Sequence, residues 1–442
     1  MKLSGLLLIF LSLAVPLVWF VPLYQARPDV AFVSQYLGAT ALIVMAIGLL
    51  LSTRFALLEH VFGPLDKIYV LHKWLGLSAV AMIWLHETID AEVRGLGAET
   101  TLSDLAESFG EQSLNGLLVL CAISVATFIP YHWWKLSHRL IGLFFALGAL
   151  HFIFILKPMA LADPVSLYLL GFSLLGLLSY LYTQLPDTWL RLPHRHKVVD
   201  VASTGDITVV RLAPENSAIK PKPGQFAFIK FDLPGAGEIH PFTISTAASS
   251  DGIIQFSIKK LGRGTTDISA ALTPGTAAWV SGPFGRFSRP TKRPQIWVAG
   301  GVGITPFVSM LQTLPAAAKV HLFYCVRDES QAVHLAEFQQ KADADNGFQL
   351  TIVRSRIEGR LTARAIAQKV AFDVHKAEVF FCGPVALRET LRSGLAQLGV
   401  ARRRFHYEAF EIRTGIGLGW IVQRVAKFIK LTPQSARAPV ER

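Results

Sequence analysis

Long apolar runs fill most of the first 183 residues and constrain the fold more than any other feature of the chain. Each run is close to the ~20 residues that an α-helix needs to cross the hydrocarbon core of a membrane. The candidate spans are residues 3–23, 31–52, 69–90, 114–130, 138–157 and 164–183. Hydrophobic residues make up 52% of the whole chain, more than an ordinary soluble protein carries. We therefore expect a transmembrane bundle of six α-helices over residues 1–190.

Charged residues in the connections predict the orientation of this bundle. Basic residues are Arg54, Lys67 and Lys73 around one short loop and Lys135 and Arg139 at another. The segment DAEVRGLGAETTLSDLAESFGEQ, between the third and fourth candidate spans, is net acidic. Basic loops stay on the cytosolic side of a membrane. We therefore expect a multi-pass protein of the cytoplasmic membrane, with both termini and the entire second half of the chain in the cytosol.

Charge and cysteine content exclude two other classes of protein. The formal net charge is +12, but the basic residues are scattered and form no basic helix interleaved with aromatic residues, so we expect no nucleic-acid partner. The three cysteines, Cys121, Cys325 and Cys382, lack the paired spacing of a disulfide framework or a zinc site. A reduced, cytosolic second half fits this pattern.

Four histidines lie within the apolar runs, where ionisable groups are costly and commonly face a partner. His72 and His86 are fourteen residues apart, which corresponds to about 21 Å of helical rise and falls only about 40° short of whole turns. His138 and His151 are thirteen residues apart and about 140° out of phase in an ideal helix. Alignment of the second pair therefore needs an irregularity, such as a π-bulge or unwinding near one of the two glycines between them.

The two histidine-bearing helices run in opposite directions, so their histidines match in depth. His72 and His138 lie near the cytosolic face, and His86 and His151 lie deeper, toward the outside. Two pairs at two levels can ligate two haems, each held by one imidazole from each helix. Taken alone, each histidine could instead be interfacial or hydrogen-bonded in the core. The match in depth of all four favours ligation.

Short β-like runs replace the apolar helices after residue 190. They are DITVVRLAP, GQFAFIKFDL, IIQFSIKKLG and TAAWVSGPFG. Several strands at close spacing without helices predict a small antiparallel β-barrel over residues 191–288. Within it, the hexapeptide HPFTIS from His240 to Ser245 combines an aromatic ring, hydroxyls and strand backbone that could hold a flat heterocycle. The alternative is a plain strand that opens at Pro241.

Strands and helices alternate over residues 289–412 and predict an α/β nucleotide-binding domain. The segment PQIWVAGGVGITPFVSMLQTL indicates a strand, a glycine-rich turn and a helix whose N-terminus could receive a phosphate. A tight connection without a ligand is the alternative for this turn. Arg327 and Cys382 follow later strands at their carboxyl ends, where doubly wound sheets bind ligands. Arg327 could pair with a 2′-phosphate or be a solvated surface residue.

The motifs HPFTIS, GPFG, GGVGITP, CGP and HYEAF follow one another in this order behind the two histidine pairs. In this combination, the chain resembles the NADPH oxidase and ferric reductase superfamily over roughly residues 30–412. The resemblance implies a transmembrane di-haem domain fused to a dehydrogenase that is similar to ferredoxin-NADP⁺ reductase. It implies FAD, two b-type haems and NADPH or NADH as cofactors.

The resemblance also implies a role for individual residues. His72 and His138 match the ligands of the inner haem, and His86 and His151 match those of the outer haem. The residues implied for FAD are His240, Pro241, Phe242, Thr243, Ser245, Lys259, Thr265 and Phe410. The residues implied for the nicotinamide nucleotide are Gly301, Gly303, Thr305, Pro306, Arg327, Cys382 and Gly383. The expected catalytic residues are Cys382, near the hydride-transfer site, and Phe410, which stacks on the isoalloxazine.

Three features depart from the family pattern. Lys259 stands where relatives often carry arginine, which keeps the charge but loses the bidentate fork. Asp90 stands four residues beyond His86, where eukaryotic oxidases place a histidine associated with oxygen reduction. Residues 413–442 form a basic C-terminal extension in which GWIVQRVAKFIK reads either as an amphipathic helix on the inner leaflet or as a solvated tail.

The function expected from the sequence is electron transfer across a membrane, from cytosolic NAD(P)H through FAD and two haems to an acceptor outside. The acceptor is O₂, which gives superoxide, or a ferric chelate, and no obligate protein partner is evident. One alternative is a membrane-anchored NAD(P)H–flavin reductase with an acceptor on the cytosolic side. Another is a haem-binding membrane module without enzymatic activity.

Overall fold

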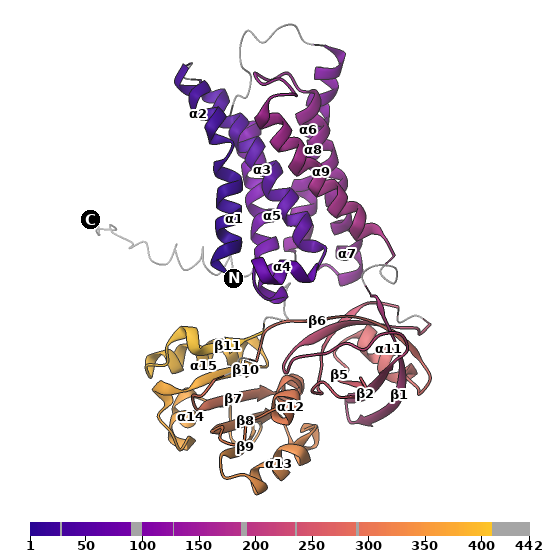
Figure 1. Cartoon of the computed structure of the whole chain (residues 1–442), viewed down its shortest axis with the longest axis vertical. Coiled ribbons are helices and arrows are strands. Elements are labelled where there is room, and N and C mark those ends of the chain that lie inside the picture. Colours follow the sequence, from indigo (N-terminus) through magenta and orange to yellow (C-terminus); the bar gives the residue numbers. More distant parts are fainter. Residues whose placement is uncertain are drawn as a thin grey trace, which may run out of the picture. The chain divides into compact units, whose positions relative to one another are not determined.

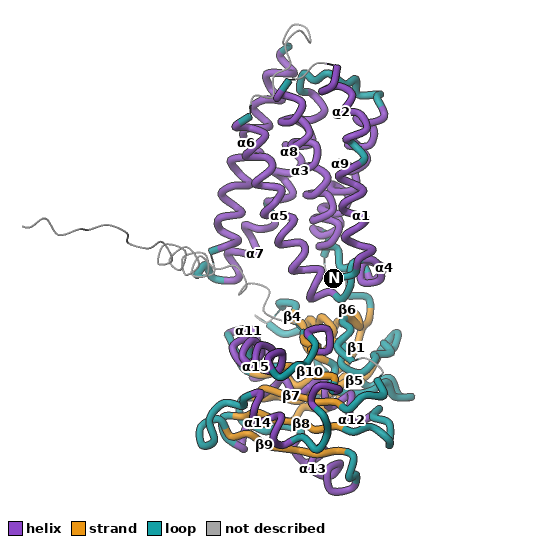
Figure 2. The backbone as a smooth tube through the Cα atoms, turned by 90° about the vertical axis from the view of Figure 1, so that its left-hand side faces the viewer, coloured by secondary structure: helices purple, strands orange, loops and turns teal. Residues whose placement is uncertain are grey.

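The fold is described from a computed structural model of the chain (Figures 1 and 2). The described residues are 1–26, 29–89, 100–126, 128–186, 192–234, 237–288 and 291–408. They form two compact units, Met1–Gln184 and Leu185–Glu408, and each is treated by itself. Three sequence predictions, those for Asp90, Phe410 and the extension at 413–442, lie outside the described residues.

The first unit is a bundle of helices (Figure 1). In chain order they are α1 (Leu3–Ala14), α2 (Leu17–Ala26), α3 (Val30–Ser52), α4 (Ala56–Val61), α5 (Leu65–Thr88), α6 (Thr101–Val125), α7 (Tyr131–Arg139), α8 (Ile141–Phe154) and α9 (Pro164–Gln184). Among the described residues, five segments are long and apolar enough to cross a membrane. They are Leu3–Ala26, Val30–Ser52, Leu65–Thr88, Tyr131–Phe154 and Pro164–Gln184. These five correspond to predicted spans, and the chain is a multi-pass membrane protein.

The helix α6 differs most from its predicted span at 114–130. It begins at Thr101 because Thr100 and Ser103 form a capping box, and it ends at Val125. Its first half is polar and carries acidic residues such as Asp104, so α6 is absent from the five apolar segments. It nevertheless packs along α8, and the Ser113 hydroxyl donates a hydrogen bond of 2.8 Å to the Phe144 carbonyl.

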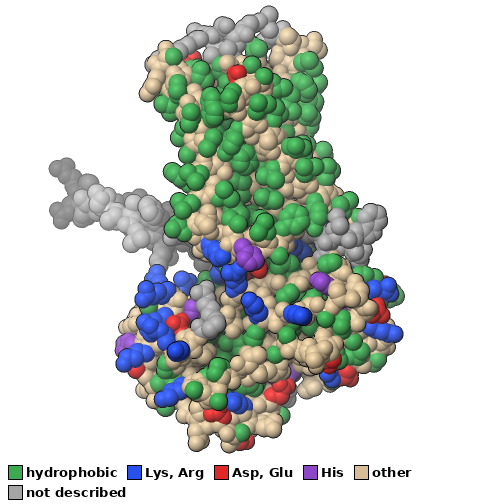
Figure 3. Space-filling view, viewed as in Figure 1, with side chains coloured by type: hydrophobic (Ala, Val, Ile, Leu, Met, Phe, Trp, Pro, Cys, Tyr) green, Lys and Arg blue, Asp and Glu red, His purple; other side chains and the backbone are tan. Residues whose placement is uncertain are grey.

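The helix α3 forms the centre of the bundle, between α5 and α9. Its small residues allow close approach: at Gly176 of α9, an added Cβ would lie 3.2 Å from the Cα of Ala46. The face of this unit seen in Figure 3 is covered mainly by hydrophobic side chains. Such a continuous apolar surface suits contact with lipid rather than water.

The second unit begins with an antiparallel sheet in the order β4-β3-β6-β1-β2-β5. Its strands are β1 (His194–Thr204), β2 (Ile207–Pro214), β3 (Phe226–Phe231), β4 (His240–Thr243), β5 (Ile254–Lys259) and β6 (Ala277–Phe284), with α11 (Arg263–Ala271) after β5. The edge strands β4 and β5 approach each other through an isolated bridge between Ile244 and Phe256. The sheet is therefore an antiparallel half-barrel, more open than the predicted barrel.

A parallel sheet follows, in the order β11-β10-β7-β8-β9. Its strands are β7 (Gln295–Gly300), β8 (Val320–Val326), β9 (Phe348–Arg354), β10 (Glu378–Cys382) and β11 (Phe405–Tyr407). The helices between them are α12 (Thr305–Gln312), α13 (Leu335–Ala344), α14 (Ala363–Lys369) and α15 (Val385–Gln397). The strand order reverses between β7 and β10, which is where doubly wound sheets bind ligands at their carboxyl ends. The predicted α/β domain is present.

Alternate residues of the parallel strands enter two separate cores. Trp297 on β7 and Phe380 on β10 are buried in one core, together with Phe307 of α12. Val298 and Phe381, their sequence neighbours, are buried in the other core. Because successive strand residues point to opposite faces, burial of both sets requires helices on both sides of the sheet.

Candidate functional site

The four predicted histidines of the bundle come together in two pairs. The ring centroids of His72 on α5 and His138 on α7 are 6.0 Å apart. Those of His86 on α5 and His151 on α8 are 6.3 Å apart. The structure therefore places one pair in the first third of the long helix α5 and the other in its last turn.

Each of the four rings is fixed through its Nδ1 atom. His72 Nδ1 lies 2.8 Å from the Gly48 carbonyl oxygen, and His151 Nδ1 lies 2.8 Å from that of Ala106. His86 Nδ1 lies 2.9 Å from the carbonyl oxygen of Ser34. All three acceptors come from α3 or α6, helices for which the sequence reasoning gave no role in the site.

These contacts assign the proton on each ring. A carbonyl oxygen only accepts, so Nδ1 donates in His72, His86 and His151. The Nδ1 atom of the fourth ring, His138, lies 3.0 Å from the Ser124 hydroxyl oxygen. This hydroxyl donates its hydrogen to a backbone carbonyl at 2.8 Å, so it accepts a hydrogen bond from the ring. In a neutral ring this leaves Nε2 unprotonated, which is the form in which a histidine binds a metal.

The spacing within each pair fits a metal between the rings. A metal bonded to both Nε2 atoms at roughly 2 Å, with about 1 Å from each nitrogen to its ring centre, needs centres roughly 6 Å apart. The observed 6.0 and 6.3 Å meet this requirement. Among the described residues, no group of three or more His, Cys, Asp or Glu side chains could hold a metal ion. Two imidazoles facing each other without further side-chain ligands among these residues suit a metal that carries ligands of its own, such as the iron of haem.

The second histidine pair is aligned by a break in the helix. His138 lies in the last turn of α7, and His151 lies on α8, so the predicted single span over 138–157 is two helices separated at Leu140. The amide of Leu140 bonds the carbonyl of Ser137, and that of Leu143 bonds the carbonyl of Leu140, both over three residues. Such 3₁₀-type turns advance about 120° per residue rather than about 100° and so reduce the expected phase error. The irregularity is a tightening near Gly142, not a π-bulge.

Two glycines make room for the rings of the deeper pair. A Cβ added at Gly38 of α3 would lie 3.2 Å from His86 Nε2. A Cβ added at Gly110 of α6 would lie 2.7 Å from His151 Nδ1. Nothing in the sequence marks these glycines, since their ring partners lie about forty or more residues away along the chain.

The predicted flavin residues gather between β4 and the start of α11. The rings of His240 and Phe242 stack with centroids 5.8 Å apart, because alternate residues of β4 share one face. A Cβ at Gly264 would lie 3.0 Å from His240 Nε2, so α11 begins directly against this ring. Thr243 is buried, and the buried Ser245 hydroxyl donates to the Gln255 carbonyl at 3.1 Å.

The other predicted flavin residues occupy surrounding positions. Pro241 is exposed on β4. The Thr265 hydroxyl accepts from the amides of Leu261 and Gly262 at 3.0 and 3.2 Å, which caps α11. Lys259 forms an ion pair of 3.5 Å with Asp206. Its ammonium nitrogen also lies 4.0 Å from where a Cβ at Gly301 would be, so Lys259 joins the half-barrel to the glycine-rich turn.

The glycine-rich turn after β7 meets the end of β10 at very short range. A Cβ at Gly303 would overlap the carbonyl oxygen of Cys382, and one at Gly383 would lie 3.0 Å from the Cα of Gly300. Gly301 adopts φ +56°, a left-handed conformation that favours glycine. Thr305 and Pro306 are buried in the first turn of α12, where the Thr305 hydroxyl donates to the Val302 carbonyl at 3.0 Å.

Cys382 is a neutral thiol in this environment. Burial raises its pKa far above the ordinary value, and the nearby Glu408 carboxylate raises that pKa further. Glu408 follows β11 and lies against the turn after β6, with an oxygen 2.9 Å from where a Cβ at Gly285 would be. Glu408 is not among the residues predicted from the sequence, although it lies two residues before Phe410 in the motif HYEAF.

Arg327 follows β8 at the carboxyl edge of the sheet and is exposed. Two neighbouring arginines are already engaged: Arg354 pairs with Glu329 and Glu358 at 3.3 and 3.2 Å, and Arg356 pairs with Asp328 at 3.6 Å. In the part of the chain that the structure describes, Arg327 has no such carboxylate. It is thus the guanidinium at this edge that remains available for an anion.

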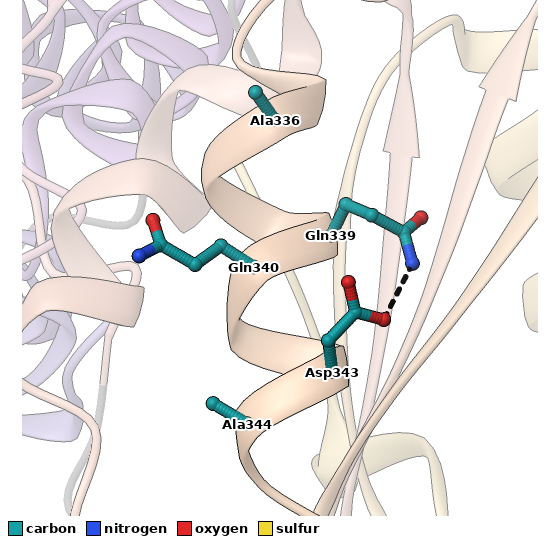
Figure 4. Close-up of a pocket in the computed structure, with 5 residues that line it drawn as sticks. All are labelled: Ala336, Gln339, Gln340, Asp343 and Ala344. Atoms are coloured by element: carbon teal, nitrogen blue, oxygen red, sulfur yellow. Dashed lines mark hydrogen bonds between the residues drawn. The ribbon is translucent and has the colours of Figure 1, made fainter.

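A shallow hollow of about 540 Å³ along α13 lies outside these sites (Figure 4). Ala336 and Ala344 line it with the polar residues of the same helix face, and Gln339 donates a hydrogen bond of 3.0 Å to Asp343. It brings together none of the predicted site residues.

Comparisons with known families cover both units. Residues 37–149 match the ferric reductase like transmembrane component, residues 194–304 match an FAD-binding domain, and residues 297–393 match an oxidoreductase NAD-binding domain. The first match includes His72, His86 and His138 and ends two residues before His151, and the other two include the described flavin and nucleotide residues.

Similar proteins match the second half of the chain. The flavohemoprotein of Bordetella pertussis is 28% identical over 236 residues, which are 47% of this chain and 58% of that protein. The reductase component of propane 2-monooxygenase from Rhodococcus jostii is 25% identical over 225 residues, 47% of this chain and 60% of that protein. The chain thus spans less than two thirds of these relatives. The FAD/NAD-binding domain of Vibrio cholerae nitric oxide dioxygenase is 21% identical, with TM-score 0.44, over 50% of this chain and 99% of that one.

Proposed function

The chain belongs to the NADPH oxidase and ferric reductase superfamily, as a membrane oxidoreductase with a ferric reductase transmembrane component fused to FAD- and NAD-binding domains, and we propose that it transfers electrons across the membrane. In this proposal, cytosolic NAD(P)H is oxidised, and an acceptor on the outer side is reduced by way of FAD and two b-type haems. The observation that carries it is the two histidine pairs, in which each ring is hydrogen-bonded through Nδ1 and has no hydrogen bond at Nε2 to any described residue.

His72 and His138 would hold one haem, and His86 and His151 would hold the other. Haem supplies a carrier that accepts and donates one electron at a time. The hydrogen bonds from Nδ1 fix the orientation of each ring and raise its basicity as a ligand. Each pair includes one ring whose Nδ1 contacts a serine hydroxyl, that of Ser124 at His138 and that of Ser34 at His86, where the Ser34 carbonyl lies equally close.

The half-barrel would bind FAD, and the parallel sheet would bind NAD(P)H, the electron donor. The proposed flavin residues are His240, Pro241, Phe242, Thr243, Ser245, Lys259, Thr265 and Phe410. The proposed nucleotide residues are Gly301, Gly303, Thr305, Pro306, Arg327, Cys382 and Gly383. Backbone amides at the start of α12 and the close approach of Gly303 to Cys382 favour a phosphate at this turn. The neutral thiol of Cys382 keeps a second negative charge away from the place where a hydride would be transferred.

The topology that fits this function has six spans, with α6 as the sixth. It packs along α8, the helix that carries His151, and its second half is apolar. The basic connections around Arg54 and Lys135 would face the cytosol, where both termini and the dehydrogenase lie. In this topology His72 and His138 are the level nearer to the cytosol.

A side-resolved assay in proteoliposomes tests this function. NADPH is added on the dehydrogenase side, and cytochrome c or a ferric chelate is enclosed on the other, with and without superoxide dismutase. We expect reduction of the enclosed acceptor, and its sensitivity to the dismutase distinguishes O₂ from ferric iron as the direct acceptor. His72→Ala and His151→Ala should abolish this reduction, whereas His132→Ala, an exposed residue of α7 outside the pairs, should leave it intact.

The similarity of the second half to a monooxygenase reductase component favours a second candidate function. In that case the chain would be a membrane-anchored NAD(P)H–flavin reductase with an acceptor on the dehydrogenase side. Reduction of an acceptor added on that side, unchanged by His72→Ala, together with no reduction of the enclosed acceptor, would establish it in place of transmembrane transfer.

A further inference from the structure

A cavity of about 430 Å³ opens at the amino-terminal edge of the parallel sheet. Its lining includes Arg293, Glu378, Phe380, Arg403, Arg404 and His406. These residues come from the approach to β7, from β10, and from the short turn and strand that follow α15. The cavity is within the range of about 300–1,000 Å³ that is usual for small-molecule sites.

Positive charge predominates around this cavity. Three guanidinium groups face one carboxylate, that of Glu378. One oxygen of Glu378 lies 2.6 Å from His406 Nε2, and the other lies 3.8 Å from Arg293 Nε, so the single acid is already shared between two partners. Across the described ranges, Arg403 and Arg404 have no carboxylate within ion-pair distance. Three arginines against one glutamate leave a charge of +2 even with a neutral imidazole.

The cavity is partly preorganised. The Arg404 guanidinium donates to the His375 carbonyl, which holds that side chain in place. The rings of Phe380 and His406 lie with centroids 4.9 Å apart and form a firm wall beside the charges. Figure 3 shows Lys and Arg side chains gathered over the part of the surface where Figure 1 labels α15 and β11. A guanidinium matches two oxygens of a phosphate in a single plane, which an ammonium does not.

This place is separate from the proposed coenzyme site. Glu378 begins β10 and Cys382 ends it, so the cavity and the glycine-rich turn lie about 13 Å apart along the strand. Coenzymes of doubly wound sheets bind at the carboxyl edge of the strands. The arginines at the opposite edge have no part in that binding.

We propose that this cavity binds a phosphate group, of a soluble phosphate compound or of an anionic lipid headgroup, through Arg293, Arg403 and Arg404. Both sources present phosphate oxygens to the same guanidinium groups. The site is independent of the proposed electron-transfer function, because none of its residues belongs to the histidine pairs or to the flavin and nucleotide sets.

Hydrogen exchange of the full-length protein tests this site and separates the two sources. In detergent, exchange of the peptide at residues 400–407 is compared with inorganic phosphate and with sodium chloride at equal ionic strength. In nanodiscs, the same peptide is compared in phosphatidylcholine alone and with phosphatidylglycerol added. We expect protection by phosphate, by phosphatidylglycerol or by both. Absence of protection in both arms would overturn the proposal.

Charge variants make the test specific to the cavity. In R403Q/R404Q the phosphate or phosphatidylglycerol content for half protection should rise at least about tenfold, since two charge-assisted contacts are lost. In R403K/R404K the content for half protection should rise less. R364Q changes an exposed arginine on α14 outside the cavity and should behave as the wild type. Protection that persists in R403Q/R404Q would overturn the proposal. If that variant loses its FAD absorbance, R293Q serves instead, with the same expectation.

Discussion

The four buried imidazoles of the bundle differ from ordinary core histidines in how their hydrogen bonds are arranged. A core histidine is satisfied when both ring nitrogens find partners, whereas among the described residues His72, His138 and His151 are hydrogen-bonded through Nδ1. The hydrogen bond at Nδ1 fixes the orientation of the ring, and Nε2 remains for another ligand. Similarly, no carboxylate of the described residues lies within ion-pair distance of Arg327, whereas Arg354 and Arg356 are paired.

Replacement of Gly110 by alanine should displace the deeper histidine pair. The new Cβ would lie 2.7 Å from His151 Nδ1, which forces the ring to move. Alanine is a better helix former than glycine, so a weaker helix cannot explain a loss. We expect about half of the haem per FAD to be lost, measured by the pyridine haemochrome method. Gly171→Ala on α9, where an added Cβ meets nothing within 4 Å, is the matched control and should retain all of it.

Replacement of Arg327 by alanine should weaken binding of NADPH selectively. A charge-assisted contact contributes about 1.5–3 kcal/mol, so we expect KM for NADPH to rise about 10- to 100-fold. KM for NADH, which lacks the 2′-phosphate, should stay within about twofold. The measurement is steady-state reduction of ferricyanide by the full chain, with Arg364→Ala as control. Equal rises for both nucleotides would show that Arg327 acts on something other than the 2′-phosphate.

The break between α7 and α8 shows how a helix is adapted to a site. A straight helix over residues 131–154 would place His138 and His151 on different faces. Two bonds over three residues at Leu140 and Leu143 tighten the turn and bring both rings toward α5. In the second unit, the glycine-rich turn after β7 is also adapted to its neighbour, because only glycine at position 303 leaves room for the end of β10.

Insertion of one alanine after Leu140 should uncouple the two histidine pairs. It rotates α7 against α8 by about 100° and shifts it by about 1.5 Å, so His138 leaves His72 while His151 stays beside His86. We expect one of the two haem signals in the reduced-minus-oxidised spectrum to disappear. Leu140→Ala changes the same exposed position without changing the phase and should keep both signals. Loss of both signals on insertion, with normal FAD content, would contradict separate pairs.

The stability of the two units depends on different surroundings, because the first unit has an apolar surface that suits lipid and the second carries charged and polar side chains on its surface. In the second unit, two buried histidines respond to acid. Burial lowers the pKa of His321 to about 4, helped by Lys369, and burial also lowers the pKa of His196. Among the described residues, His321 Nδ1 and His196 Nε2 have no hydrogen-bond partner. Both rings are therefore held in the neutral form.

The stability of this unit should fall as the pH drops from 6.5 toward 4. Unfolding exposes His321, which then binds a proton that the folded state accepts only near pH 4, so the unfolded chain binds more protons in this window. Above pH 6.5 neither state binds it, and the effect vanishes. We expect the temperature of FAD release, followed by flavin fluorescence, to drop by about 5 °C or more across the window. His321→Gln should reduce the drop, and His132→Gln should not.

Local features of the sequence were enough to predict the class of the protein and the order of its domains. Apolar length, histidine spacing, the strand pattern and the order of short motifs each depend on residues close together in the chain, and they predicted a membrane bundle followed by an antiparallel flavin domain and an α/β nucleotide domain. The residues that fix the site were beyond such reasoning. Gly48 and Ala106 hold His72 and His151 across 24 and 45 residues. Glu408 and the arginine cavity arise only when distant strands align. Periodicity records which face a residue occupies, whereas the partner on that face is set by packing of the folded chain.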